Sequence, residues 1–216
     1  GKDYRDVVLV RDFYDSLTSG YLYHKAGHEC WLTPDGKKEK EGFNGYHNFD
    51  EYILHFLPHE PPKKDRNMCR YMADEEEAVG MRVYMDFIFH NGYQDLLRMW
   101  RYQQIPSQRH KIIFVCYSDL TRPGKDLELV EKSLDHFYPN KTAPEVYKKK
   151  VLARPPSKRA MNYSGGHATT KDTAVRDRLH ALIHQLDKEH FNGMVEWAAS
   201  LFPSCHGKSS PGSSTA

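Results

Sequence analysis

The 216-residue sequence has no apolar run approaching the roughly 20 residues that a membrane-spanning helix needs. It also shows no secretory signal peptide. Its formal net charge is only +2, too small to indicate a nucleic-acid-binding protein. With 39% hydrophobic and 28% charged residues, the composition is typical of a globular protein. We therefore expect no nucleic acid among its partners, and a membrane anchor only upstream of Gly1.

Cysteine is scarce, and the four that are present lack the C-x-x-C spacing of zinc ribbons and thioredoxin-like sites. Cys116 lies in an apolar segment, so we expect a buried thiol there. Cys30 and Cys69 fall in or beside predicted loops and are candidates for a disulfide in an oxidising compartment. No partner is predicted for Cys205.

The histidines give little indication of a metal site. His24, His28 and Cys30 form an H-x-x-x-H-x-C pattern, and His180 and His184 lie one helical turn apart. Zinc can use such spacings, but neither grouping supplies an obvious set of four ligands. We therefore expect no metal cofactor.

The most informative segment is residues 7–24, VVLVRDFYDSLTSGYLYH. Its aliphatic run, Val7 to Val10, predicts a strand buried on both faces within a parallel sheet. From Phe13 onward the apolar residues recur at helical spacing. The segment is therefore predicted to form a strand, a tight turn and a helix, which is half of a βαβ unit.

Two polar residues of this segment are candidate ligands for a phosphate. Arg11 lies at the carboxyl end of the predicted strand, where α/β proteins bind ligands, and Ser19 follows about two helical turns later. A guanidinium and a hydroxyl in these places can converge on one anion. The alternative is that Arg11 pairs with Asp12 or Asp15 and that Ser19 only allows its neighbours to pack.

The remaining elements follow from apolar periodicity. It predicts a second buried strand over residues 111–116 and helices over residues 48–57, 74–90, 93–102, 127–134, 144–152, 173–190 and 193–202. Residues 25–47 and 154–171 are predicted loops, and residues 206–216 a disordered tail. We expect one α/β domain over residues 1–205, with a parallel sheet flanked by helices.

The pattern Arg11-Asp12, six residues, then Ser19-Gly20-Tyr21 resembles the 3′-phosphate-binding motif of sulfotransferases that use 3′-phosphoadenosine 5′-phosphosulfate (PAPS). In that family the Arg and Ser of the motif hold the 3′-phosphate of the nucleotide. The resemblance implies the same role for Arg11 and Ser19. Proline is common in the family where this chain has Phe.

Later segments resemble the same family. The strand over residues 111–116, followed by Tyr-x-Asp-Leu, Pro and a helix, is similar to its downstream part. An LD…F…W…LFP segment looks like the C-terminal part of carbohydrate-type sulfotransferases. We expect packing roles for its residues Leu186, Asp187, Phe191, Trp197, Leu201 and Phe202.

Two loops are candidates for further ligand contacts. The late PAPS-binding loop of the family resembles Ser164, Gly165, Gly166 and His167, although the Lys-Gly-x-x-Gly form is absent. The alternative for this loop is a surface turn without a ligand. Residues 25–66 are the candidate acceptor-facing segment, or else a solvated insertion. Its candidate substrate-binding residues are Trp31, Tyr46 and His47.

The resemblance implies a P-loop-NTPase-like fold and transfer of a sulfonate group from PAPS to a hydroxyl or amine of an acceptor, a carbohydrate. The first strand, the phosphate loop and the catalytic residues are expected upstream of Gly1, so that this chain is a fragment with little or no activity. The expected location is the Golgi lumen or membrane, with the cytoplasm as the alternative. Two rivals remain: a catalytically dead module that binds a nucleotide or an anionic glycan, and an unrelated phosphate-binding enzyme such as a small kinase.

Overall fold

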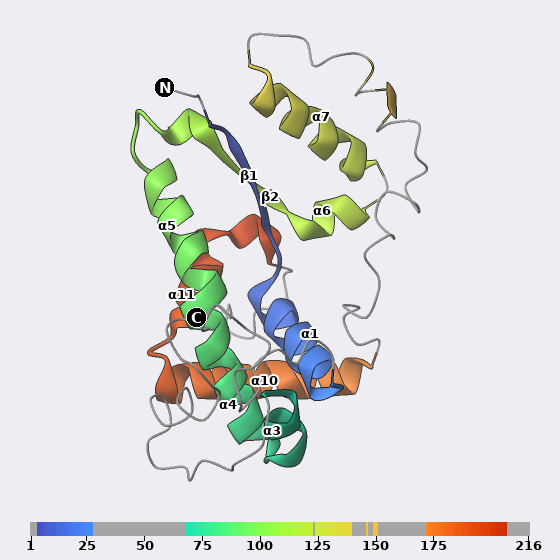
Figure 1. The fold of residues 1–216 in the computed structure, drawn as a ribbon, viewed down its shortest axis with the longest axis vertical. Coiled ribbons are helices and arrows are strands. Elements are labelled where there is room, and N and C mark those ends of the chain that lie inside the picture. Colours follow the sequence, from blue (N-terminus) through green and yellow to red (C-terminus); the bar gives the residue numbers. More distant parts are fainter. Residues whose placement is uncertain are drawn as a thin grey trace, which may run out of the picture. The chain divides into compact units, whose positions relative to one another are not determined.

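The computed structural model describes residues 4–27, 68–122, 124–139, 146, 149–150 and 172–206 (Figure 1). These residues form a mostly helical α/β structure with a small parallel sheet. The elements in chain order are β1 (Asp6–Val10), α1 (Phe13–Lys25), α3 (Met68–Asp74), α4 (Glu77–Ile88), a π-helical turn (Phe89–Tyr93), α5 (Gln94–Gln103), a 3₁₀ turn (Arg109–Lys111), β2 (Ile112–Cys116), α6 (Tyr117–Thr121), α7 (Lys125–Phe137), α10 (Thr173–His190), α11 (Met194–Leu201) and a second 3₁₀ turn (Pro203–Cys205).

The chain divides into two compact units. Unit 1 comprises Gly1–Phe13, Leu96–Gly165 and Trp197–Ala216. Unit 2 comprises Tyr14–Asp95 and Gly166–Glu196. Unit 1 therefore contains both strands, and unit 2 contains most of α1, α4 and α10.

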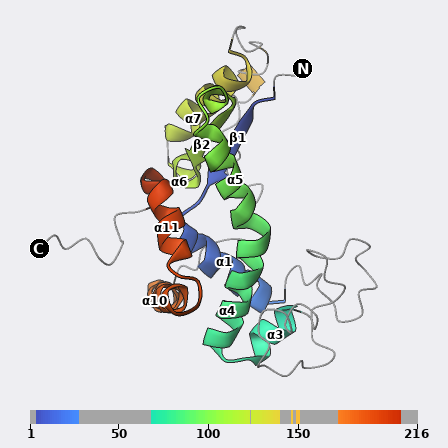
Figure 2. The ribbon, with the colours of Figure 1, turned by 90° about the vertical axis from the view of Figure 1, so that its left-hand side faces the viewer.

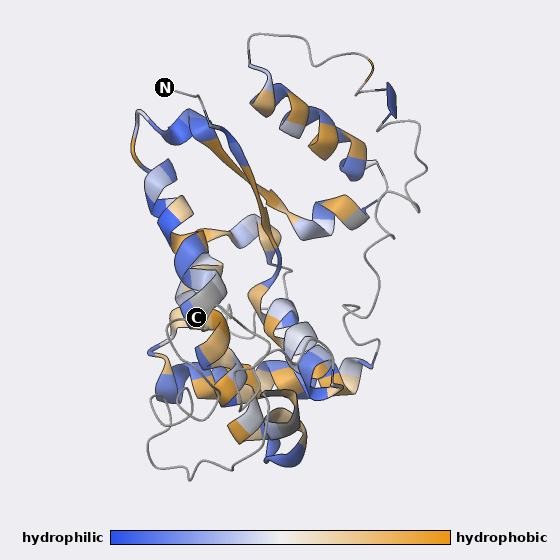
Figure 3. Ribbon diagram, viewed as in Figure 1, coloured by the Kyte–Doolittle hydropathy of each residue, from blue (hydrophilic) through white to orange (hydrophobic). Residues whose placement is uncertain are grey.

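The sheet of unit 1 consists of β1 and β2, which pair in parallel with Val10 opposite Cys116. Both strands are apolar along most of their length (Figure 3). Because side chains alternate along a strand, Phe114 and Cys116 lie on one face of the sheet. The Phe114 ring lies 4.9 Å from that of Phe202, so the C-terminal segment covers this face. Both predicted strands are confirmed.

The prediction that β1 is buried on both faces is wrong. Val10 is buried, but the Leu9 side chain is 48% exposed and Val7 and Val8 are only partly covered. Strands in the middle of large parallel sheets are enclosed by helices on both sides. Among the described residues the sheet has only two strands, and the elements that pack on them leave Leu9 partly exposed.

The core of unit 2 is formed by apolar side chains of α1, α3, α4 and α10. The most deeply buried are Leu17, Tyr21, Met72, Met81, Met85, Leu179 and Ile183. Gly20 of α1 leaves room for the Tyr84 side chain of α4, because a Cβ atom on Gly20 would lie 1.8 Å from the Tyr84 hydroxyl. The predicted helix over residues 173–190 is confirmed residue for residue as α10.

The chain is continuously helical from Glu77 to Gln103, through α4, the π-helical turn and α5 (Figure 2). The interruption predicted at Asn91-Gly92 falls inside the π-helical turn, so the helix is locally widened there but does not end.

The short helices α3 and α6 were not predicted. The predicted helix over residues 48–57, most of the one over residues 144–152, and residues 207–216 lie outside the described part of the chain.

Candidate functional site

The carboxyl ends of β1 and β2 form one edge of the sheet in unit 1, because the strands are parallel and in register. Arg11 and Asp12 follow β1, and Tyr117 follows β2 directly as the first residue of α6. Ligands of open parallel sheets bind at this edge. Sequence analysis predicted a ligand site at this edge, because it placed Arg11 at the carboxyl end of the first strand.

The Arg11 guanidinium lies over the Tyr117 ring, with its carbon 5.4 Å from the centre of the ring. Such a cation–π contact contributes about 0.5–1 kcal/mol at exposed sites, and the Tyr117 side chain is 39% exposed. A cation–π contact is an attraction to the charge of the guanidinium, whereas anions are bound by hydrogen bonds from its N–H groups. The contact with Tyr117 is therefore compatible with binding of a phosphate or sulfonate.

Asp12 contacts the C-terminal segment. An Asp12 carboxylate oxygen lies 3.1 Å from Nδ1 of His206, whose side chain is only 9% exposed. The His206 ring also lies 5.1 Å from the Phe13 ring. Successive residues after β1 thus contact different segments: Arg11 meets the start of α6, and Asp12 meets the end of the described chain.

Asp15 belongs to unit 2 and contacts two basic side chains of α10. Its Oδ1 atom lies 2.9 Å from Nε of Arg176 and 3.2 Å from Nε2 of His180. Asp12 and Asp15 were the two alternative partners for Arg11, and each has a contact with a basic side chain far along the sequence.

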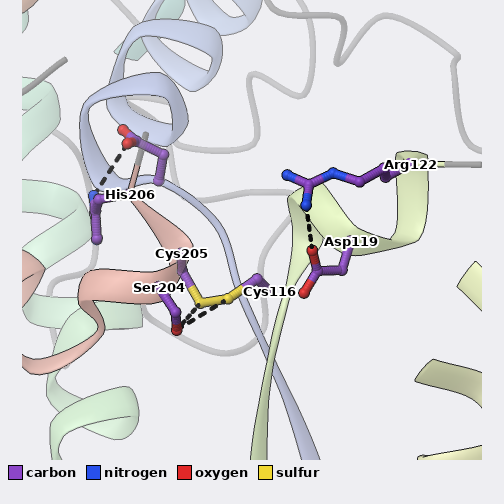
Figure 4. Close-up of a disulfide and its surroundings, with 7 residues drawn as sticks. Cys116, Asp119, Arg122, Ser204, Cys205 and His206 are labelled. Carbon is purple, nitrogen blue, oxygen red and sulfur yellow. Dashed lines mark hydrogen bonds and ion pairs between the residues drawn. A yellow bond between two sulfur atoms is a disulfide. The ribbon is translucent and has the colours of Figure 1, made fainter. Parts of the chain in front are cut away.

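A disulfide joins the end of β2 to the C-terminal segment. Cys116 is bonded to Cys205, 89 residues away, and the prediction of a buried thiol at Cys116 is wrong (Figure 4). The Ser204 hydroxyl lies 3.6 Å from the Cys116 sulfur and must be the donor, because a disulfide sulfur carries no hydrogen. Cys69 is also disulfide-bonded, and Cys30 lies outside the described residues.

Ser19, the second predicted phosphate ligand, lies on α1 in unit 2 and is only 4% exposed. Arg11 belongs to unit 1. The two residues after Ser19 have packing roles: Gly20 accommodates Tyr84, and Tyr21 is fully buried. Burial raises the pKa of the Tyr21 hydroxyl to about 12. Packing therefore explains the Gly-Tyr part of the motif without a ligand.

The other predicted binding residues lie outside the described part of the chain. They are Trp31, Tyr46, His47, Ser164, Gly165, Gly166 and His167.

The C-terminal residues expected to pack are mostly buried, since Leu186, Asp187, Phe191 and Phe202 are all enclosed. Trp197 is an exception, at 43% exposed, and Leu201 is only partly buried. Val195 and Ala198, three residues apart on α11, are the buried positions, and Trp197 lies on another side of the same helix.

The described residues contain no group of three or more His, Cys, Asp or Glu side chains placed to hold a metal ion. His24 packs 5.6 Å from the Tyr84 ring, and His180 contacts Asp15. None of the helices within the described ranges is both long and apolar enough to cross a membrane.

His206 and Tyr117 are the site residues that sequence reasoning missed. Tyr117 could have been found from its place directly after a buried strand. No local signal indicated His206, because it begins a polar, glycine- and serine-rich segment that is typical of disorder.

A scan of the chain against protein-family models found no match, and searches of curated proteins and of solved structures found none either.

Proposed function

We propose that this protein is a PAPS-dependent sulfotransferase, which transfers a sulfonate group from PAPS to a hydroxyl or amine of a carbohydrate acceptor and releases 3′,5′-ADP. The observation that carries the proposal is the position of Arg11. It belongs to the Arg-Asp…Ser-Gly-Tyr pattern, and it lies at the carboxyl end of a parallel strand with its guanidinium held against Tyr117.

In this proposal the rim N–H groups of Arg11 bind the 3′-phosphate of the nucleotide. The resemblance also implies Ser19 as a phosphate ligand and the segment from Ser164 to His167 as the late nucleotide loop, and neither of these carries the proposal. Each charge-assisted hydrogen bond contributes about 1.5–3 kcal/mol. The reaction also needs a cation that neutralises the leaving 5′-phosphate and a base that takes the proton of the acceptor. This proposal gives neither role to a residue that the structure describes.

The proposed fold is a P-loop-NTPase-like sheet of which β1 and β2 are part. The parallel pairing of these two apolar strands, each followed by a helix, supports this. The Cys116–Cys205 disulfide supports a location in an oxidising compartment, for which we propose the Golgi lumen.

The test is the affinity of the chain for 3′,5′-ADP, measured by calorimetry on the wild type and on Arg11→Ala. Loss of the guanidinium should weaken binding about 10- to 100-fold, from the energy of a hydrogen bond to a charged group. Arg5→Ala is the matched control. Arg5 precedes the same strand and donates to the carbonyls of His110 and His136, so it belongs to the opposite end of the sheet.

Equal affinities in the wild type and Arg11→Ala would contradict the proposal. The same titrations separate the rivals. Equal binding of 5′-ADP and 3′,5′-ADP would favour a kinase-like phosphate site, whereas 3′,5′-ADP binding by a full-length protein that transfers no sulfonate from PAPS would favour a binding module.

A further inference from the structure

The segment Ser204 to His206 is attached to the ends of both strands. Cys205 is bonded covalently to Cys116, the last residue of β2. The next residue, His206, reaches Asp12 in the turn after β1. Val10 and Cys116, the last residues of the two strands, are opposite each other in the sheet. The disulfide and the hydrogen bond to Asp12 therefore tie the ends of β1 and β2 together in this register.

The chemistry of the two side chains fixes the direction of the hydrogen bond. An ionised carboxylate can only accept, so Nδ1 of His206 carries the hydrogen and donates it to Asp12. The Nε2 atom is buried and has no hydrogen-bond partner among the described residues. The imidazole is therefore held through Nδ1 and through its contact with the Phe13 ring, 5.1 Å away.

The hydrogen bond and the disulfide both restrict the surroundings of Arg11. Asp12 is its neighbour in the chain, so a fixed Asp12 restricts the backbone from which the Arg11 side chain extends. Tyr117, over whose ring the guanidinium lies, is the neighbour of the disulfide-bonded Cys116. Both partners of the cation–π contact are thus adjacent to residues that the C-terminal segment holds.

We propose that His206 is a positioning residue for the turn that carries Arg11, and that the Cys116–Cys205 disulfide keeps His206 in place. The nucleotide-binding part of this inference rests on the proposed function. The ordering of the turn does not, and it can be measured without any ligand.

The experiment compares His206→Ala, His206→Asn and His206→Gln in the 216-residue chain. The side-chain N–H of Asn falls near the position of Nδ1, and that of Gln near Nε2. We expect faster amide hydrogen exchange at residues 11–13 and about tenfold weaker 3′,5′-ADP binding in the Ala and Gln variants. His206→Asn should restore both properties to near wild-type values, at a melting temperature close to that of His206→Gln.

His136→Ala is the matched control, because Nε2 of His136 lies 3.1 Å from the Lys111 carbonyl, just before β2 begins. It should leave both readouts unchanged. The double variant Cys116→Ala, Cys205→Ala should reproduce the exchange and affinity changes of His206→Ala.

Wild-type exchange at residues 11–13 in His206→Ala would overturn the inference. So would equal behaviour of the Asn and Gln variants, since the ring would then only fill space. If the wild type binds no 3′,5′-ADP, the proposed function fails, and the exchange measurement still decides whether His206 positions the turn.

Discussion

The carboxylate of Asp187 accepts hydrogen bonds from the backbone amide of Val195, at 3.0 and 3.1 Å. It also accepts from the amide of Glu196 at 3.1 Å, and its side chain is almost completely buried. Asp187 lies near the end of α10, and the two amides belong to the first turn of α11. One buried side chain thus caps α11 from the preceding helix.

We predict that Asp187→Ala lowers the free energy of unfolding by about 2–3 kcal/mol, because buried amides would be left without partners. Asp172→Ala is the matched control. Asp172 caps the start of α10 by accepting from the amides of Ala174 and Val175, but these bonds are exposed to water. Its loss should cost only about 1 kcal/mol. Urea unfolding of both variants measures the difference, and equal losses would contradict the buried cap.

Gly20→Ala should destabilise the protein by about 1–3 kcal/mol through overpacking. The added methyl group would lie 1.8 Å from the Tyr84 hydroxyl, and Tyr84 is itself enclosed by the rings of Tyr21 and Phe87. The control is Gly92→Ala, since a Cβ atom at Gly92 meets nothing within 4 Å. Thermal unfolding should show a lower melting temperature for the first variant alone. An unchanged value would contradict the close contact between Gly20 and the Tyr84 hydroxyl.

Asp86 makes stability depend on pH. Burial raises the pKa of its carboxyl from 3.8 to about 6, although Arg82 and His90 act in the opposite direction. The folded state therefore binds the proton more tightly than the unfolded state does. The resulting stabilisation is complete below about pH 4 and is lost as the pH rises to about 6.

Asp86→Asn should therefore be more stable than the wild type at pH 7.5, by about 1–2 kcal/mol after allowance for solvent screening. The two proteins should have similar stability near pH 4. Asp135→Asn, which removes an exposed carboxylate on α7, controls for the change of net charge. A gain for Asp86→Asn that is the same at both pH values would contradict the assignment.

The elements that sequence reasoning predicted well are those specified locally. The strands have continuous aliphatic runs, and α10 begins at the capping residue Asp172 and keeps one apolar face through Leu179, Ile183 and Leu186. The short helix α6 has only five residues, too few for a periodic pattern to be recognised.

The site was predicted only in part, for a related reason. Arg11 could be found because its position after a strand is a local feature. The Cys116–Cys205 bond joins residues 89 apart, and the hydrogen bond between Asp12 and His206 spans most of the chain. Neither contact leaves a pattern in the neighbouring sequence. The exposure of Leu9 likewise depends on which elements cover the sheet, not on the strand itself.

The most direct test of the central claim is a binding cycle with two nucleotides and two proteins. 3′,5′-ADP and 5′-AMP differ only in the 3′-phosphate, and their affinities are measured on the wild type and on Arg11→Ala. The wild type should prefer 3′,5′-ADP by about tenfold or more, and Arg11→Ala should lose most of that preference. A preference that is the same in both proteins would show that Arg11 does not bind the 3′-phosphate, and would contradict the proposed function.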